Sequence, residues 1–160
     1  MKKIMFVCHG NICRSPMAEF VMKKLVAERG LEREFLIESS ATHTDEIWLG
    51  RGNPIYPPAR EQLIIHSVDF DENKRAVLLE KEDYKKYDLF VCMDGENIRS
   101  MKRIFGFDPD GKCVKLMDFT KRGGDVSDPW YTRDFALAFS DIYEGCNALL
   151  EELLNNNKEF

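Results

Sequence analysis

Apolar positions near the start of the chain change from a continuous run to a helical period. Residues 4–7 are all apolar, which is typical of a strand buried on both faces of a parallel sheet. Apolar side chains then recur at helical spacing at Met17, Phe20, Val21 and Leu25. Ser15 and Pro16 stand before them. Because serine caps helix starts and proline fits the first helical position, we predict a helix that begins there and ends at Gly30.

The same alternation continues along the rest of the chain. The pattern predicts strands over residues 34–40, 88–93 and 115–117 and helices over residues 58–66, 97–105 and 135–154. Glycines and prolines within residues 41–58 block regular structure, so this stretch is expected to be a loop. Strands that alternate with helices favour a parallel sheet with helices on both faces. The predicted fold is an α/β three-layer sandwich around a small four-stranded parallel sheet.

Length and composition restrict the class of protein. The 160 residues contain no internal repeat or linker, so a single domain over residues 1–160 is expected. Hydrophobic residues make up 44% and charged residues 32%, which argues against a disordered or fibrous chain. The net charge of −5 does not imply a nucleic-acid partner, so any anion site must be formed locally.

The expected cellular compartment is argued from the lengths of the apolar runs and from the cysteine content. No run of 18 apolar residues occurs, and the apolar part of MKKIMFVCHG is too short for a signal peptide, so no membrane association is expected. Five cysteines without the spacing of a disulfide framework fit a reducing environment. A cytoplasmic location is therefore expected.

The stretch FVCHGNICRSP places residues 8–14 between the first strand and the first helix. Ligands of open parallel sheets bind at the carboxyl ends of the strands, and helix N-termini attract anions through free N–H groups. Gly10 and Asn11 tolerate the left-handed backbone that turns successive N–H groups inward. Arg14 can hold two phosphate oxygens with its planar guanidinium. The loop is thus expected to bind an oxyanion.

Cys8 at the base of this loop is the candidate nucleophile. A helix N-terminus and a nearby arginine favour the thiolate form of a cysteine, and the Ser15 hydroxyl can donate a hydrogen bond to the sulfur. A lone cysteine at a strand end is more often a small buried apolar residue. The order strand, cysteine, five residues, arginine, serine, helix favours the nucleophile. No second ligand pair accompanies Cys8 and Cys13, which argues against zinc.

The segment VCHGNICRSP resembles the Cys-x5-Arg-Ser signature of the low-molecular-weight protein tyrosine phosphatases. Further matches follow in family order at residues 38–42, 52–54, 66, 75, 87–94, 97 and 127–131. The resemblance therefore spans nearly the whole chain. It implies a sheet of strand order 2-1-3-4, with the phosphate-binding loop after the first strand. It also implies hydrolysis of phosphotyrosine through a cysteinyl-phosphate intermediate.

The resemblance assigns roles to the loop residues. Cys8 would be the nucleophile, and Arg14 would clamp the phosphate and stabilise the transition state. The other members of the phosphate-binding loop would be His9, Gly10, Asn11, Ile12, Cys13 and Ser15. Family members trap the oxidised nucleophile as a reversible disulfide with the cysteine that matches Cys13. Cys13 is therefore either a redox partner of Cys8 or a packing residue inside the loop.

Asp128 is implied to be the general acid and base. Departure of a phenolate is accelerated by a proton donor, and the resulting carboxylate would activate water against the cysteinyl-phosphate. Taken alone, an Asp-Pro pair usually starts a turn, so the assignment rests on the family order of the segments. Trp130 and Tyr131 occupy positions where the family carries aromatic side chains that flank the substrate ring. Trp48 is either the opposite wall or a residue that packs its own loop.

Three residues are implied to support the loop. In the family, residues matching Ser39 and His66 hold the asparagine that matches Asn11. The alternative for His66 is an ordinary residue at a helix end. Asp94 is expected to brace the region around the loop.

The implied partners are a phosphotyrosine-bearing protein or peptide and inorganic phosphate, which would be both product and inhibitor. No cofactor, metal ion, nucleic acid or membrane is implied, and the chain would be a monomer or a weak dimer. Three rivals remain. A protein-arginine phosphatase would carry threonine where Ile12 stands, and a thiol-dependent arsenate reductase would need a cysteine pair that residues 75–90 lack. The third rival is a module that binds a phosphorylated ligand without hydrolysing it.

Overall fold

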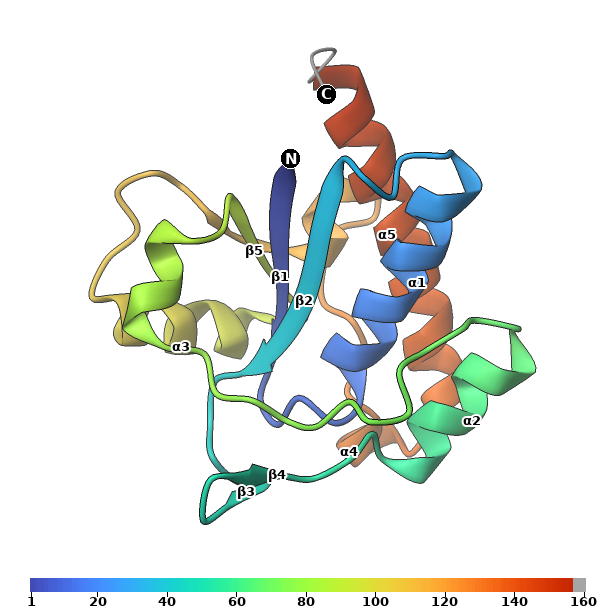
Figure 1. Cartoon of the computed structure of the whole chain (residues 1–160), viewed down its shortest axis with the longest axis horizontal. Helices are drawn as coiled ribbons and strands as arrows, with labels where there is room; N and C mark the ends of the chain where they lie inside the picture. Colours follow the sequence, from blue (N-terminus) through green and yellow to red (C-terminus); the bar gives the residue numbers. More distant parts are fainter. Residues whose placement is uncertain (157–160) are drawn as a thin grey trace.

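The computed structural model of the protein describes residues 1–156. A four-stranded parallel sheet forms its centre (Figure 1). Its strands are β1 (Lys2–Cys8), β2 (Phe35–Ala41), β5 (Leu89–Cys92) and β6 (Cys113–Lys115). They lie in the order β2-β1-β5-β6, and all three pairings are parallel. Numbered among themselves, the four strands follow the order 2-1-3-4. The predicted fold class and strand order are confirmed.

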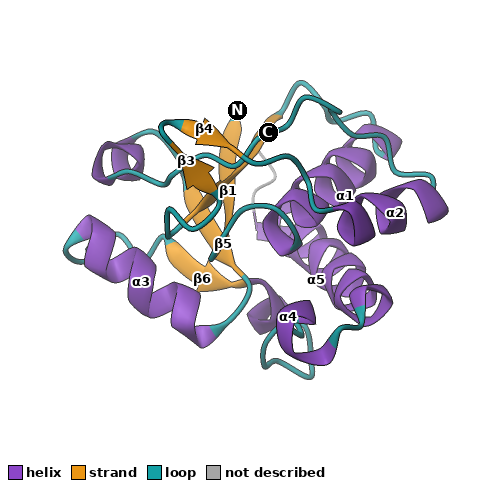
Figure 2. Cartoon of the chain, turned by 90° about the horizontal axis from the view of Figure 1, so that it is seen from below, coloured by secondary structure: helices purple, strands orange, loops and turns teal. Residues whose placement is uncertain are grey.

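Helices cover both faces of this sheet (Figure 2). On one side lie the helices α1 (Arg14–Glu28), α2 (Pro57–Ile65) and α5 (Phe135–Asn156), and on the other lie α3 (Gly95–Phe105) and the 3-10 helix η1 (Lys81–Lys85). Two short elements complete the fold, the 3-10 helix η2 (Leu116–Phe119) and the helix α4 (Pro129–Thr132). No helix within residues 1–156 is long and apolar enough to cross a membrane.

The side chains of β1 explain why its sequence is a continuous apolar run. Ile4 and Phe6 belong to the larger core cluster, which includes residues of α1 and α5. Met5 and Val7 belong to the second cluster, which includes residues of α3. Successive strand residues point to opposite faces, so a strand covered on both sides must be apolar at every position.

Local boundaries differ from the predictions at several points. The helix α1 begins at Arg14, and its N-cap is Cys13 without a side-chain cap bond, so Ser15 is not the cap. Ser15 lies inside the first turn because its hydroxyl is used by the neighbouring loop. The last strand ends at Lys115, and the next four residues form η2. Gly30 follows the helix with φ +69, as expected of a residue that ends a helix.

The predicted loop over residues 41–58 contains a small antiparallel hairpin, β3 (Ile47–Trp48) and β4 (Arg51–Gly52). This hairpin, the loop after β1 and α4 lie at the same end of the molecule (Figure 1). Asn53 accepts a hydrogen bond from the Ala76 N–H through its carbonyl oxygen at 2.9 Å, which ties the hairpin to the segment before β5. A Cβ at Gly52 would overlap the Ala76 carbonyl and lie 2.7 Å from the Ala76 nitrogen. Only glycine fits this contact.

We expect Gly52→Ala to lower the free energy of unfolding by about 1–3 kcal/mol, because backbone rather than a flexible side chain must move aside. Gly95→Ala is the matched control, since its nearest neighbour is a side-chain atom of Arg99 at 3.7 Å. That variant should stay within about 0.5 kcal/mol of the parent protein. Urea unfolding followed by circular dichroism gives both values. Equal stability of the two variants would contradict the close contact at Gly52.

Candidate active site

The loop between β1 and α1 turns around the sulfur of Cys8. The Asn11 N–H points at Cys8 Sγ at 3.3 Å, and Ser15 Oγ lies 3.0 Å from the same sulfur. Asn11 adopts a left-handed backbone with φ +60, a conformation that non-glycine residues visit at a cost. This turn directs a backbone N–H inward, as required of an anion-binding loop.

The side chain of Asn11 fixes this left-handed turn. Its Nδ2 donates to Ser15 Oγ at 2.8 Å and to Ser39 Oγ at 3.0 Å, and its Oδ1 accepts from the Val77 N–H at 3.1 Å. Ser15 Oγ accepts from Asn11 and can donate its hydroxyl hydrogen to Cys8 Sγ when the sulfur is ionised. A donor in this place stabilises a negative charge on the sulfur.

Sequence reasoning missed the buried Glu19, which extends this network. Glu19 Oε1 accepts from Ser39 Oγ at 2.6 Å, and Lys23 Nζ lies 2.7 Å from Glu19 Oε2. Lys74 Nζ lies 3.8 Å from Oε1 and donates to the Ser39 carbonyl at 3.0 Å. Burial lowers the pKa of Lys74, and the Glu19 carboxylate partly opposes that shift. An acidic residue amid the apolar positions of the first helix was the available signal.

Arg14 joins the loop to two other parts of the chain. Its guanidinium donates to the Val126 carbonyl at 3.0 Å and to Asp94 Oδ2 at 2.8 Å, and it lies 3.5 Å from Asp128 Oδ2. Burial pulls the pKa of Arg14 down, but the negative charges of Cys8, Asp128 and Asp94 together raise it above the ordinary value. The side chain is therefore a fixed cation with a fixed orientation.

Asp94 and Asp128 each cap the start of a helix and also lie beside Arg14 in the site. Asp94 Oδ1 accepts from the Asn97 N–H at 2.9 Å as the N-cap of α3, while its other oxygen binds Arg14. Asp128 is the N-cap of α4, and its Oδ1 accepts from the Trp130 N–H at 3.0 Å. Both carboxyls are thus held in place by helix starts, where serine, asparagine and aspartate are favoured.

One pocket of about 520 Å³ brings the expected residues together. It is lined by Cys8, His9, Gly10, Asn11, Ile12, Cys13, Arg14, Asp94, Asp128, Trp130 and Tyr131, with Ser15 directly below Cys8. Its volume is within the range of small-ligand sites. Trp130 packs against Tyr56 with ring centroids 5.2 Å apart, and Tyr131 is largely exposed at the rim.

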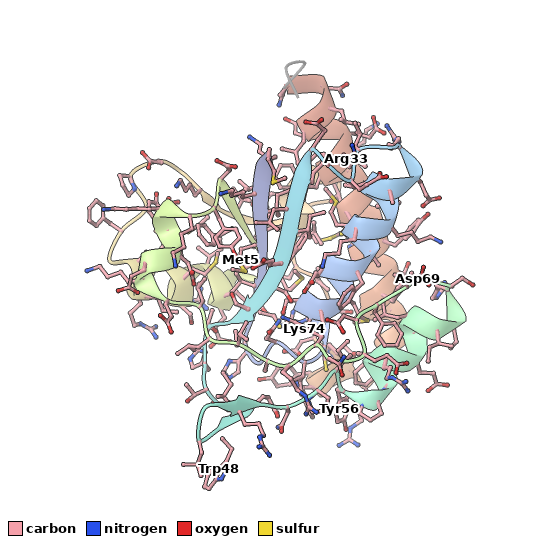
Figure 3. All side chains as sticks on the ribbon, viewed as in Figure 1. Met5, Arg33, Trp48, Tyr56, Asp69 and Lys74 are labelled. Atoms are coloured by element: carbon pink, nitrogen blue, oxygen red, sulfur yellow. The ribbon has the colours of Figure 1, made fainter. Side chains whose placement is uncertain are left out.

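Two expected residues lie elsewhere. Trp48 is 76% exposed at the outer tip of the hairpin and points away from the rest of the molecule (Figure 3). The pocket is lined instead by His43, Asp45 and Glu46 of the segment before β3. His66 is a helix-end residue whose ring stacks on Phe139 with centroids 4.1 Å apart. Asn11 obtains its partners from Ser15, Ser39 and the Val77 backbone, so His66 is not needed there.

The cysteines differ in environment. Burial and the neighbouring Cys8 raise the pKa of the Cys13 thiol, and Arg14 opposes the shift only in part. Burial also raises the pKa of Cys113 to about 12 and shifts Cys92 and Cys146 in the same direction. All five cysteines are free. Within residues 1–156, no three His, Cys, Asp or Glu side chains are grouped so that they could hold a metal ion.

The sequence pattern described as "Low molecular weight phosphotyrosine protein phosphatase" matches residues 3–159. The chain belongs to this family. It is similar to "Low molecular weight protein-tyrosine-phosphatase YfkJ" of Bacillus subtilis, with 34% identity over 155 residues and 96% of both chains covered. The Gallus gallus "Low molecular weight phosphotyrosine protein phosphatase" is 35% identical over 157 residues, which cover 95% of this chain and 96% of the relative.

Solved structures support the same membership. The crystal structure of YfkJ from Bacillus subtilis superimposes with a TM-score of 0.89 at 33% identity, covering 98% of this chain and 97% of that one. A structure described as Drosophila arginine phosphatase superimposes with a TM-score of 0.80 at 25% identity, covering 95% and 97%. Substrate class must therefore be argued from the pocket of this phosphatase.

Asp141 on α5 is a second residue that sequence reasoning missed. The Asp141 side chain is buried, and both of its carboxylate oxygens have partners. Oδ2 accepts from the Ser127 N–H at 2.9 Å, and Oδ1 accepts from Arg122 at 2.6 Å. The adjacent Val126 N–H donates to the Met93 carbonyl at 2.8 Å. These contacts fix the backbone just before Asp128. The only sequence signal was one acidic residue within the apolar stripe of the last helix.

We expect Asp141→Asn to lower kcat roughly 10- to 100-fold, because an amide cannot accept from both donors and Asp128 would lose its position. The loss should be larger on phenyl phosphate than on p-nitrophenyl phosphate, whose leaving group needs less help from an acid. Glu144→Gln is the matched control, since Glu144 is exposed and its carboxylate pairs with the same Arg122. Steady-state kinetics on both esters measure the two losses in kcat. Equal losses on the two esters would show that Asp141 acts only through stability.

Proposed function

We propose that this protein hydrolyses phosphotyrosine in proteins or peptides through a cysteinyl-phosphate intermediate. The observation that supports this most strongly is the convergence of Cys8, Arg14 and Asp128 on one pocket at the N-terminus of α1. A nucleophile, a fixed cation and a carboxyl are the three groups that the reaction needs. The relatives named above carry the same activity in their names.

In the first step the phosphate oxygens bind the loop N–H groups and Arg14. Cys8 Sγ attacks phosphorus, so that the S–P bond forms while the P–O bond to the tyrosine ring breaks. Protonated Asp128 gives its proton to the departing phenolate oxygen. Arg14 stabilises the charge that develops on the transferred phosphoryl group, because its orientation is already fixed by Asp94 and Val126.

In the second step the Asp128 carboxylate takes a proton from a water molecule that attacks phosphorus. The P–O bond to water forms and the S–P bond breaks, which returns Cys8 as a thiolate and releases inorganic phosphate. The Ser15 hydroxyl, 3.0 Å from Cys8 Sγ, stabilises the departing sulfur. Phosphate occupies the same loop as the substrate and therefore inhibits the enzyme as its product.

Aromatic walls favour phosphotyrosine over the rival substrates. Trp130 and Tyr131 offer ring faces beside Asp128, and Ile12 offers no hydroxyl to a guanidinium. A protein-arginine phosphatase remains the main alternative, and an arsenate reductase and a binding module are further outcomes of the test below. Redox pairing of Cys8 with Cys13, a cytoplasmic location and a monomeric or weakly dimeric state also stay predictions.

We expect phosphate release from a phosphotyrosine peptide and none from peptides of the same sequence that carry phosphoserine or phosphoarginine, with a chelator present. Cys8→Ser should lower turnover by more than about 10³-fold while still binding the phosphotyrosine peptide, because serine is not activated as a nucleophile here. A malachite green assay and fluorescence polarisation measure the two effects.

Each other outcome points to a rival. Preference for phosphoarginine would identify the arginine phosphatase, and thiol-dependent reduction of arsenate would identify the reductase. Binding of the peptide by the parent protein without phosphate release would leave a binding module. Undiminished turnover by Cys8→Ser would refute the nucleophile.

Asp128→Asn should lower kcat about 10²- to 10⁴-fold on phenyl phosphate and much less on an ester with an activated leaving group, because asparagine has no proton to give. The change keeps a residue that caps helices, so α4 should be preserved. Asp134→Asn is the matched control, because Asp134 caps the start of α5 and does not line the pocket. Equal losses on both esters would argue against general acid catalysis by Asp128.

A further inference from the structure

The lining of the pocket carries both signs of charge. Helix α3 contributes Arg99 and Arg103 to the lining, and the segment before β3 contributes Asp45 and Glu46. The loop carrying Cys8 lines the same cavity. A peptide that places its phosphotyrosine on the loop therefore comes near one basic and one acidic edge of the pocket.

Arg99 and Arg103 are free to bind an anion. They are four residues apart, so they lie one above the other on the same face of α3, and both are exposed. Neither guanidinium takes part in an ion pair or a hydrogen bond with any residue in the described range 1–156. Glu96 lines the same edge and offsets one of the two charges, which leaves this edge with a net positive charge.

The edge formed by the segment before β3 repels anions. His9 Nε2 lies 2.7 Å from Asp45 Oδ2, and the His9 ring stacks on His43 with centroids 4.0 Å apart. The hydrogen bond from His9 holds the pKa of Asp45 below its ordinary value, so this carboxyl is ionised. Glu46 lies against Gly10 of the loop and accepts from Asn53 Nδ2 at 2.7 Å. Two carboxylates therefore face the mouth from this side.

We propose that Arg99 and Arg103 form a second anion subsite, which binds an acidic group on a residue next to the phosphotyrosine of the substrate. The group is a carboxylate of Asp or Glu or a second phosphate ester, since arginine binds both with its planar fork. Together with the acidic edge, the subsite also sets the direction in which the peptide crosses the pocket. This inference rests on the proposed phosphotyrosine phosphatase function.

The expected size of the preference for acidic peptides follows from the solvent exposure of Arg99 and Arg103. Exposed ion pairs contribute modestly, so two arginines should give an acidic peptide a roughly 3- to 10-fold advantage in kcat/KM at low salt. A second phosphate carries more charge than a carboxylate and should gain more. Because the pairs are exposed, the preference should shrink as ionic strength rises from about 0.01 M to 0.5 M.

The experiment compares phosphotyrosine peptides that differ only beside the phosphotyrosine. One set has Ala, Glu or Lys at the flanking positions, before or after the phosphotyrosine, and one has phosphoserine there. The parent protein should favour Glu over Ala over Lys on one flank, and phosphoserine should exceed Glu. The double variant R99E/R103E should lose or invert this order. Lys102→Glu is the control, and it is compared with the single variants R99E and R103E, which carry the same change of charge, because Lys102 is exposed on the same helix but does not line the pocket.

The possible results separate the two levels of the proposal. No turnover of any peptide by the parent protein would refute the phosphatase function itself. Turnover of all peptides with equal kcat/KM would refute only the subsite. Equal loss of preference in Lys102→Glu and in the single variants R99E and R103E would also refute it, since net charge rather than a located site would then be responsible. A gain with phosphoserine alone would restrict the ligand to a second phosphate.

Discussion

The left-handed turn at Asn11 is the constraint on which the catalytic loop depends. An L-residue in this conformation costs about 1–2 kcal/mol, so the turn persists only because other contacts determine it. Three hydrogen bonds supply that constraint: the Asn11 side chain donates to Ser15 and Ser39 and accepts from the Val77 N–H. They tie the loop to its own helix, to β2 and to the chain that approaches β5. The position of Cys8 Sγ is thus set by elements that lie far apart in sequence.

Arg14 has the corresponding role for charge. A pocket that holds Cys8, Asp94 and Asp128 would repel a phosphate dianion unless a cation were fixed among them. Two of these negative groups are already engaged: Asp94 caps α3 and binds Arg14, and Cys8 faces a backbone N–H and the Ser15 hydroxyl. The loop amides and one face of Arg14 are left for the ligand.

The sequence was sufficient for features that depend on neighbouring residues. The apolar run of β1 and the glycine after α1 act locally, and the sequence predicts both correctly. The cysteine-to-arginine spacing is also local, and it places Cys8 and Arg14 in one pocket. Asp141 could not be predicted, because its importance comes from a contact with Ser127 that only tertiary packing creates. His66 and Trp48 were assigned by resemblance, and in this chain a different set of partners holds Asn11 while the hairpin carries Trp48 away from the pocket. A serine before a proline is typical of an N-cap, so the sequence predicts Ser15 as the cap, yet its hydroxyl lies 3.0 Å from Cys8 Sγ instead.

The buried loop of the site is held by more contacts than its exposed rim. This difference affects which residues can change with substrate specificity. Cys8, Asn11 and Arg14 are all buried, and each is held by contacts to more than one element. The rim residues Tyr131, Arg99 and Arg103 are exposed, and α4 is a single turn. A substitution at the rim removes few contacts and leaves the loop geometry intact, whereas one at the loop leaves buried polar groups without partners. Charge and aromatic content at the mouth are therefore free to vary with substrate, while the chemistry beneath them is fixed by the core.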